Sequence, residues 1–252
     1  MRTIVALLTG IVLSGAAVAA SIEEDVERYV KIFSGDRGQH SEAVDTLSWM
    51  GLSDPRLFDI IERLLLDDSL AARDNRAERN RVARYIRALG FSGQAKYEAT
   101  VRKYLGDRSY ERFAAAALED LRSYQKWNPI ISNRATFDAK YDDDVNRVAN
   151  MLRADDLLLK RVGAKRVFFR HQDEVLLDLL AQGVAGSYAT IDPRKTGTLA
   201  ADSVAWMVKA MGKTGNPKYQ PLLQEVAAKA KDPTVVRYAQ KALDDHYGGV
   251  RR

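Results

Sequence analysis

An internal repeat is the feature that most limits how this chain of 252 residues can fold. The segment 83–97 matches the segment 205–219 at an offset of 122, with six identical positions out of fifteen. A second block, 112–120, matches 237–245 at an offset of 125, and both copies read Arg, aromatic, Ala, two variable residues, Ala, Leu, acid, Asp. Two blocks in the same order predict that one structural unit is copied along the chain.

A weaker third copy indicates the length of that unit. Leu47, Met50 and Gly51 lie 39 residues before their counterparts in the block 83–97, and 122 is close to three times 41. A period of about 40 residues is typical of units built from two α-helices.

The residues at the joins also favour helix, turn and helix. A glycine follows each of three apolar-periodic runs, where a residue free to adopt positive φ can end a helix. These glycines are Gly51, Gly90 and Gly212. Three pairs place an acceptor side chain before a proline, the order of an N-cap and a first helical residue. These pairs are Asp54-Pro55, Asn216-Pro217 and Asp232-Pro233. Alternating β-branched residues are essentially absent, so the sequence predicts an all-α chain.

The repeated blocks resemble the HEAT-repeat, armadillo-type family. The resemblance rests on Leu89-Gly90 to Tyr97, Arg112 to Leu118, Met211-Gly212 to Tyr219, Asp232-Pro233, and Arg237 to Leu243. It implies an α-α superhelix, or solenoid, of about five helical hairpins, whose inner face usually binds other proteins. Some relatives act as lyase-type chaperones for tetrapyrroles. The resemblance is far more specific for fold than for activity.

We expect a single solenoid domain over residues 21–252, with two irregular segments. The first lies near 127–144, where Trp127-Asn128-Pro129 and Asp142-Asp143-Asp144 interrupt the turn pattern, and the second spans 188–198. The sequence leaves open whether these are functional insertions or decayed repeats.

Residues 1–20 have the three-part layout of a cleavable signal peptide. Arg2 is the only charge, an apolar stretch runs from Ile4 to Leu13, and small residues follow. Cleavage is expected just before Ala20 or Ser21. The alternative is an uncleaved anchor, since 4–20 is at the lower limit of a bilayer span. We therefore expect an exported bacterial protein, periplasmic or secreted, with no transmembrane segment after cleavage.

Composition and motifs argue against several classes of protein. The chain has no cysteine, which excludes disulfides and thiolate metal sites. The histidines His40, His171 and His246 are scattered, and no nucleophile elbow occurs.

Gly212-Lys213-Thr214 lacks the first glycine of a phosphate-binding loop, and 192–203 lacks the ligands of a calcium loop. Lys and Arg exceed Asp and Glu by 39 to 34, but the signs are intermixed, so no nucleic acid partner is expected. The sequence predicts neither an enzyme nor a cofactor or metal.

A row of arginines is the candidate binding site. At about 100° per residue, Arg73, Arg76, Arg84 and Arg87 fall on one side of a helix, opposite an apolar stripe. Arginine forks suit carboxylates and phosphates. The alternative is a solvated face that nearby acidic residues partly neutralise.

The tryptophans and two recurring Lys-Tyr pairs are assigned to packing. Trp49 and Trp206 are expected on the first helix of their hairpins, and all three tryptophans, with Trp127, in the core. Lys96-Tyr97 and Lys218-Tyr219 match between repeats, which the repeated architecture explains without a ligand.

The leading hypothesis is a non-catalytic exported scaffold or adaptor that binds a protein partner in the bacterial cell envelope through successive second helices. One alternative is the binding of an anionic envelope component, peptidoglycan or lipid phosphate, by the arginine row. Another, implied by the resemblance, is a cofactor-handling, lyase-like role, which would need a deep pocket with convergent polar groups.

Overall fold

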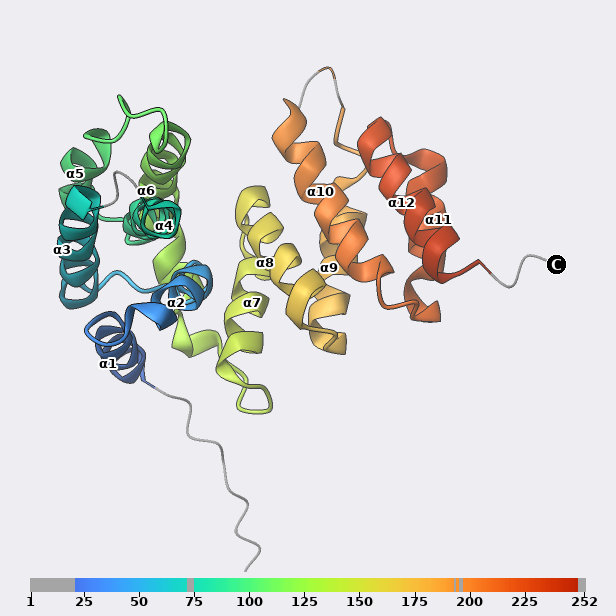
Figure 1. The fold of residues 1–252 in the computed structure, drawn as a ribbon. Helices are drawn as coiled ribbons and strands as arrows, with labels where there is room; N and C mark the ends of the chain where they lie inside the picture. The colour runs from blue at the N-terminus through green and yellow to red at the C-terminus, as the bar shows by residue number, and fades with distance from the viewer. Residues whose placement is uncertain (1–20, 72–74, 193, 195–196, 249–252) are drawn as a thin grey trace, which may run out of the picture.

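The chain is helical throughout the part that the computed structural model describes, residues 21–71, 75–192, 194 and 197–248 (Figure 1). No strand occurs in those ranges, which confirms the predicted all-α fold. The α-helices are α1 (Ile22–Phe33), α2 (His40–Leu47), α3 (Pro55–Ala71), α4 (Arg76–Phe91), α5 (Glu98–Arg102), α6 (Glu111–Ile131), α7 (Asp143–Arg153), α8 (Leu157–Arg170), α9 (Glu174–Ser187), α10 (Gly197–Gly212), α11 (Gln220–Lys229) and α12 (Pro233–His246). Short 3₁₀ helices lie at Arg37–Gln39, Ala95–Tyr97, Arg134–Thr136 and Pro217–Tyr219.

Successive helices form hairpins that stack side by side as a HEAT-like solenoid (Figure 1). The described residues form six pairs, from α1–α2 to α11–α12, where the sequence predicts about five. The second helices of neighbouring hairpins pack on one another, α2 on α4, α4 on α6, α8 on α10 and α10 on α12. We call the surface formed by these six helices the second-helix face. One hairpin cannot bury its own apolar stripe, so each depends on its neighbours.

The buried core divides into two clusters. The N-terminal cluster extends from Val26 to Leu159, and the C-terminal cluster extends from Val145 to Ala242. Helices α7 and α8 contribute to both clusters. The boundary therefore falls beside the irregular segment 127–144, where the repeat pattern is interrupted.

Helix starts at the predicted prolines are confirmed. They are Pro55, Pro217 and Pro233. The Asp232 carboxylate accepts hydrogen bonds from the N–H groups of Thr234 and Val235, and Asn216 accepts one from Lys218. These acceptors satisfy N–H groups that a helix start leaves without partners.

The prediction that Gly90 and Gly212 end their helices with positive φ is wrong. Gly90 is the last but one residue of α4 and Gly212 is the last residue of α10, and the positive φ values belong to Gly93 and Gly215, three residues later. Gly51 does have a positive φ, of 69°.

Gly90 and Gly212 instead allow second helices to approach closely. A Cβ on Gly90 would lie 2.8 Å from the Ala117 carbonyl oxygen, and a Cβ on Gly212 would lie 2.5 Å from the Cβ of Ala242. Ala117 and Ala242 are themselves equivalent, at the offset of 125. The repeat has therefore preserved a helix crossing at these positions.

The irregular segment 127–144 is helical at both ends. Helix α6 continues through Trp127-Asn128-Pro129 to Ile131, and α7 begins after Asp142, whose carboxylate accepts a hydrogen bond from the Val145 N–H. Two buried asparagines at or beside this segment, Asn128 and Asn150, donate to the backbone of several turns. Each amide nitrogen donates to three backbone carbonyls at 3.0–3.3 Å. Asn150 thereby closes the turn after α6, where the glycine pattern is absent. Asn128 instead donates to carbonyls in the turns after α2 and α4, which contain Gly51 and Gly93.

The second irregular segment, 188–198, is partly described. Tyr188 and Ile191 are buried in the C-terminal cluster, and α10 begins at Gly197. Residues 193, 195 and 196 lie outside the described residues, as does the expected signal peptide, 1–20. Helix α1 begins directly afterwards, with Ser21 and Glu24 forming a capping box. No helix in the described part of the chain is both long and apolar enough to cross a bilayer.

Candidate binding face

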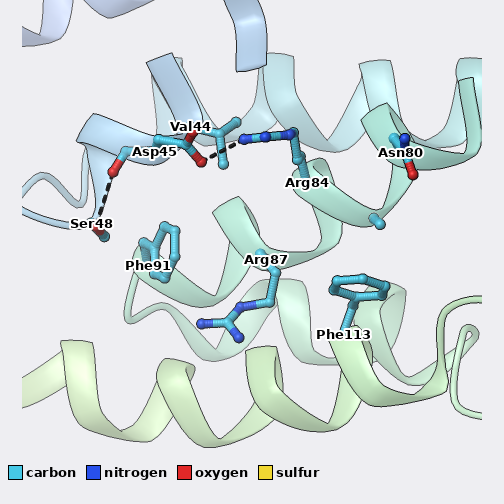
Figure 2. Close-up of a pocket in the computed structure, with 9 residues that line it drawn as sticks. Val44, Asp45, Ser48, Asn80, Arg84, Arg87, Phe91 and Phe113 are labelled. Carbon is cyan, nitrogen blue, oxygen red and sulfur yellow. Dashed lines mark hydrogen bonds and ion pairs between the residues drawn. The ribbon is translucent and has the colours of Figure 1, made fainter. Parts of the chain in front are cut away.

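Two grooves open on the second-helix face, one in each half of the chain. The N-terminal groove, of about 450 Å³, is formed by α2, α4 and α6, and Figure 2 shows the side chains that line it. They are Val44, Asp45, Ser48, Asn80, Ala83, Arg84, Arg87, Phe91 and Phe113. The C-terminal groove, of about 470 Å³, is formed by α8, α10 and α12. Its lining residues are Phe168, Lys209, Lys213, Tyr238, Lys241, Ala242, Asp245 and His246.

The two grooves occupy equivalent positions in the repeat. The offset of 122 aligns Arg87 with Lys209, and the offset of 125 aligns Phe113 with Tyr238. Each groove thus carries a cation from its central helix and an aromatic ring from the next second helix. Volumes of this size suit a small ligand or the side chains of a bound segment.

The predicted arginine row is brought together only in part. Arg84 and Arg87 share the N-terminal groove, while Arg76 is exposed at the start of α4 and does not line it. Arg73 lies outside the described residues.

Both groove arginines are paired with carboxylates on neighbouring helices. Arg84 Nη1 lies 2.5 Å from Asp45 Oδ1, and Figure 2 shows this pair spanning the groove wall. Arg87 forms an ion pair with Asp120. Burial raises the pKa of Asp120 to about 6, although the Arg87 charge opposes that rise. At neutral pH Asp120 is therefore largely ionised and offsets the Arg87 charge. Asp45 lies against Arg84 in the same way.

The C-terminal groove holds its lysines against aromatic rings. Lys209 Nζ lies 3.8 Å from the ring centroid of Trp206 and 5.0 Å from that of Tyr238. Lys213 Nζ lies 4.5 Å from the ring centroid of Phe168 and donates to its carbonyl oxygen at 2.8 Å. Within the described residues, neither ammonium has a carboxylate at ion-pair distance. The N-terminal groove has paired arginines, whereas these lysines contact rings. A position-by-position comparison of the two repeat copies in the sequence could have revealed this difference between the grooves.

The predicted placement of the tryptophans is partly wrong. Trp206 lies on the second helix α10, beside the groove, and stacks edge-on to Phe168 with ring centroids 5.6 Å apart. Phe169, which is 64% exposed, completes this aromatic cluster. Trp49 lies in the turn after α2, and Trp127 is buried as expected. Trp206 belongs to a matched block that forms mostly a second helix, and its ring lies on the side of α10 that carries Lys209.

Each of the two Lys-Tyr pairs, at the start of a hairpin, forms a hydrogen bond and an ion pair with an aspartate of the preceding hairpin. In Lys96-Tyr97, the hydroxyl donates to Asp59 at 2.8 Å and the ammonium lies 2.6 Å from the same carboxyl group. Lys218-Tyr219 contacts Asp178 in the same way, at 2.8 and 2.7 Å. The lysine hydrogen bond holds the pKa of Asp178 below its ordinary value. Repeated packing thus explains why these pairs recur.

The acidic run at the start of α7 is engaged in the fold. No group of three or more side chains suited to a metal ion occurs among the described residues. Asp142 caps the helix, and Asp144 lies 2.6 Å from Arg166 and 2.8 Å from His171. His171 is the C-cap residue at which α8 ends. The segment 192–203 is described only in part.

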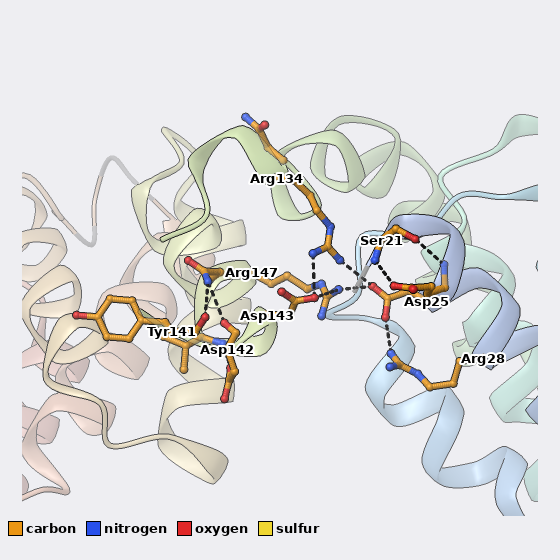
Figure 3. A network of polar contacts seen from close by, with 12 residues as sticks. Ser21, Asp25, Arg28, Arg134, Tyr141, Asp142, Asp143 and Arg147 are labelled. Carbon is orange, nitrogen blue, oxygen red and sulfur yellow. Dashed lines mark hydrogen bonds and ion pairs between the residues drawn. The ribbon is translucent and has the colours of Figure 1, made fainter. Parts of the chain in front are cut away.

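A buried ion network joins the first helix to the middle of the chain (Figure 3). Asp25 of α1, whose side chain is 2% exposed, lies 2.6 Å from Arg28 and 3.2 Å from Arg134, and it also pairs with Arg147 of α7. Asp143 lies 2.9 Å from Arg134 and extends the network. No local pattern reveals these partners, because Arg134 and Arg147 lie 109 and 122 residues from Asp25.

Comparisons with known proteins bear on fold and on one prediction of function. No family model matches the chain, and no curated protein matches it. Among solved structures, the chain is similar to human deoxyhypusine hydroxylase in complex with glycerol, at 15% identity and a TM-score of 0.37. The match covers 90% of this chain and 97% of that chain.

The matched protein is an enzyme, which contradicts the prediction that this chain is not one. That prediction rested on missing motifs. A stacked-helix scaffold can bring side chains of distant hairpins to one face, so catalysis on such a fold needs no local motif.

Proposed function

We propose that this chain is an exported recognition protein of the bacterial cell envelope, which binds a protein partner through the second-helix face. One observation carries the proposal: two grooves at equivalent repeat positions each cross three second helices. Both grooves present aromatic rings beside cations, and Tyr, Trp and Arg are the side chains that most often dominate binding energy at protein interfaces. Export is supported by the signal-peptide pattern of residues 1–20.

Site-specific photo-crosslinking in cells tests this proposal. A photoreactive amino acid replaces Asn80 or Lys241, two exposed groove residues, or, as controls, Arg63 of α3 or Gln224 of α11 on first helices. The groove positions are expected to form adducts with the same protein, and the control positions are not. Adducts of equal yield at all four positions, or at the controls alone, would contradict the proposal.

The alternative is an anionic envelope component, peptidoglycan or lipid phosphate, held by Arg76, Arg84 and Arg87. The pairing of Arg84 with Asp45 and of Arg87 with Asp120 argues against it, because a ligand must displace those carboxylates. Binding to vesicles or peptidoglycan that weakens steeply with salt and is lost in the Arg84→Gln/Arg87→Gln variant would favour this alternative.

A further inference from the structure

The two grooves differ in how their charges are balanced. In the N-terminal groove, Arg84 pairs with Asp45 of the lining and Arg87 pairs with Asp120 outside it, so a carboxylate offsets each arginine. The C-terminal groove is lined by three lysines and one aspartate, which leaves a net charge of +2 with His246 neutral.

Two lysines that the first copy lacks explain the imbalance, Lys213 at the counterpart of Phe91 and Lys241. Asp245 is the counterpart of Asp120, but its carboxylate lies 2.9 Å from Lys241. The counterpart of Lys241 in the first copy is Ala116, so the added lysine occupies the carboxylate that would otherwise face Lys209.

Aromatic rings hold the remaining lysines without neutralising them. The Lys209 ammonium lies within 5.2 Å of the ring centroids of Phe168, Trp206 and Tyr238. That contact positions a cation but offers no acceptor for its three N–H donors. One N–H group of the Lys213 ammonium donates to the Phe168 carbonyl oxygen.

A third lysine borders the same aromatic cluster. Lys165 Nζ lies 5.0 Å from the Trp206 ring centroid. Its pKa is lowered by burial and by the positive charges of Arg161 and Lys209. Asp202, which pairs with Arg161, opposes this shift. Lys165, Lys209 and Lys213 thus surround the same rings, and an anion bound there gains from several charges at once.

We infer that the C-terminal groove binds an acidic segment of the partner protein, with a carboxylate between Lys209 and Lys213 and an apolar side chain against Phe168 and Trp206. This inference rests on the proposed function. A lysine ammonium is a compact positive charge that donates hydrogen bonds to a single carboxylate. The aromatic rings supply apolar contact area for a neighbouring side chain.

Charge over the whole face favours a short acidic segment over a polyanion. A nucleic acid or an anionic membrane needs a continuous basic surface. Of the two grooves, only the C-terminal one has lysines without a carboxylate at ion-pair distance among the described residues, because Arg84 and Arg87 of the other groove are paired. Asp245 in the wall of the C-terminal groove interrupts its basic surface.

The test measures binding of a short fluorescein-labelled peptide of glutamate, phenylalanine and serine to the purified protein by fluorescence anisotropy. The same peptide with glutamine in place of glutamate is the ligand control. We expect the Lys209→Gln/Lys213→Gln variant to bind the acidic peptide at least about tenfold more weakly. The wild type should show a similar loss for the glutamine peptide.

The matched protein control is Lys103→Gln/Lys229→Gln, which removes the same net charge from exposed positions outside the grooves. It should bind like the wild type. The single variant Lys213→Gln, at an exposed residue, guards against misfolding and should bind several-fold more weakly.

Equal affinity for both peptides, or equal loss in both double variants, would overturn the inference. So would tighter, Lys209-dependent binding to phosphatidylglycerol vesicles or single-stranded DNA. If crosslinking from Asn80 and Lys241 persists in the Lys209→Gln/Lys213→Gln variant, the recognition face stands and only the acidic ligand fails. If neither Asn80 nor Lys241 forms adducts when Lys209 and Lys213 are both unchanged, the proposed function itself fails.

Discussion

At the scale of single residues, the repeat preserves positions where a side chain has no room. Gly90 and Gly212 lie where a Cβ would meet Ala117 and Ala242 of the next second helix at less than 3.0 Å. Neither glycine needs positive φ, so the requirement is for space. The glycine match between 83–97 and 205–219, from which the sequence predicts a turn, therefore reflects a helix–helix contact in the fold.

Gly90→Ala and Gly212→Ala are expected to lower the free energy of unfolding by about 1 to 3 kcal/mol, because the added methyl group pushes second helices apart. Urea unfolding followed by circular dichroism measures the loss. Gly186→Ala, on the open side of α9, is the control and should cost nothing, since alanine favours helix where no atom lies within 4 Å. Equal effects at all three sites would refute the packing role.

His171 makes folding stability depend on pH. Its hydrogen bond to Asp144 raises the pKa of His171 above the ordinary 6.5, although burial opposes the rise. A raised histidine pKa gives stability that is fully present below about pH 6.5 and is lost as the pH rises through the folded-state value.

For Asp144, burial alone would raise the pKa, but hydrogen bonds from His171 and Arg166 outweigh it and the net pKa falls below 3.8. The contribution of Asp144 to folding stability is therefore present above about pH 3.8 and is lost as the pH falls through the lower folded-state pKa. We expect His171→Gln to reduce the fall in wild-type stability between about pH 6 and 8. Thermal unfolding at several pH values measures the difference, and parallel profiles for the two proteins would contradict it.

At the scale of helices, the ion network around Asp25 fixes α1 against α7. Asp25 and Arg147 have side chains only 2% and 5% exposed, so removing one partner leaves the other charged and buried. Asp25→Ala should cost about 3 to 5 kcal/mol of unfolding free energy. Arg28→Ala is the control, because Arg28 is 53% exposed and exposed pairs contribute about 0 to 1 kcal/mol. Similar losses from both variants in urea titrations would show that the network adds no particular stability.

How far the sequence predicts these helices depends on the range of the interactions. Caps such as Asp232 lie beside the N–H groups they accept from, so a local pattern reveals them. The role of Gly90 depends on α6, and the partners of Asp25 lie more than a hundred residues away, so neither follows from spacing. For the candidate site, helical periodicity placed Arg84 and Arg87 on one face but could not show that Asp45 and Asp120 pair with them.

At the scale of the whole molecule, a few contacts cross the boundary between the two core clusters. The Trp127 indole N–H donates to Asp156 at 2.8 Å, Arg166 stacks over Trp49 at 4.1 Å, and Asp25 pairs with Arg147. In a stacked array each unit is stabilised through its neighbours, so weakening one interface separates the parts on either side.

Hydrogen–deuterium exchange across a urea series follows α3–α4 in the N-terminal cluster and α10–α12 in the C-terminal cluster separately. In the wild type both regions are expected to lose protection at one urea concentration, because α7 and α8 belong to both clusters. The Asp25→Asn/Trp127→Phe variant removes two of the crossing contacts, and its two regions should lose protection at different concentrations. A single shared midpoint that merely moves to lower urea would mean that the helices shared by the two clusters alone keep the chain one cooperative unit.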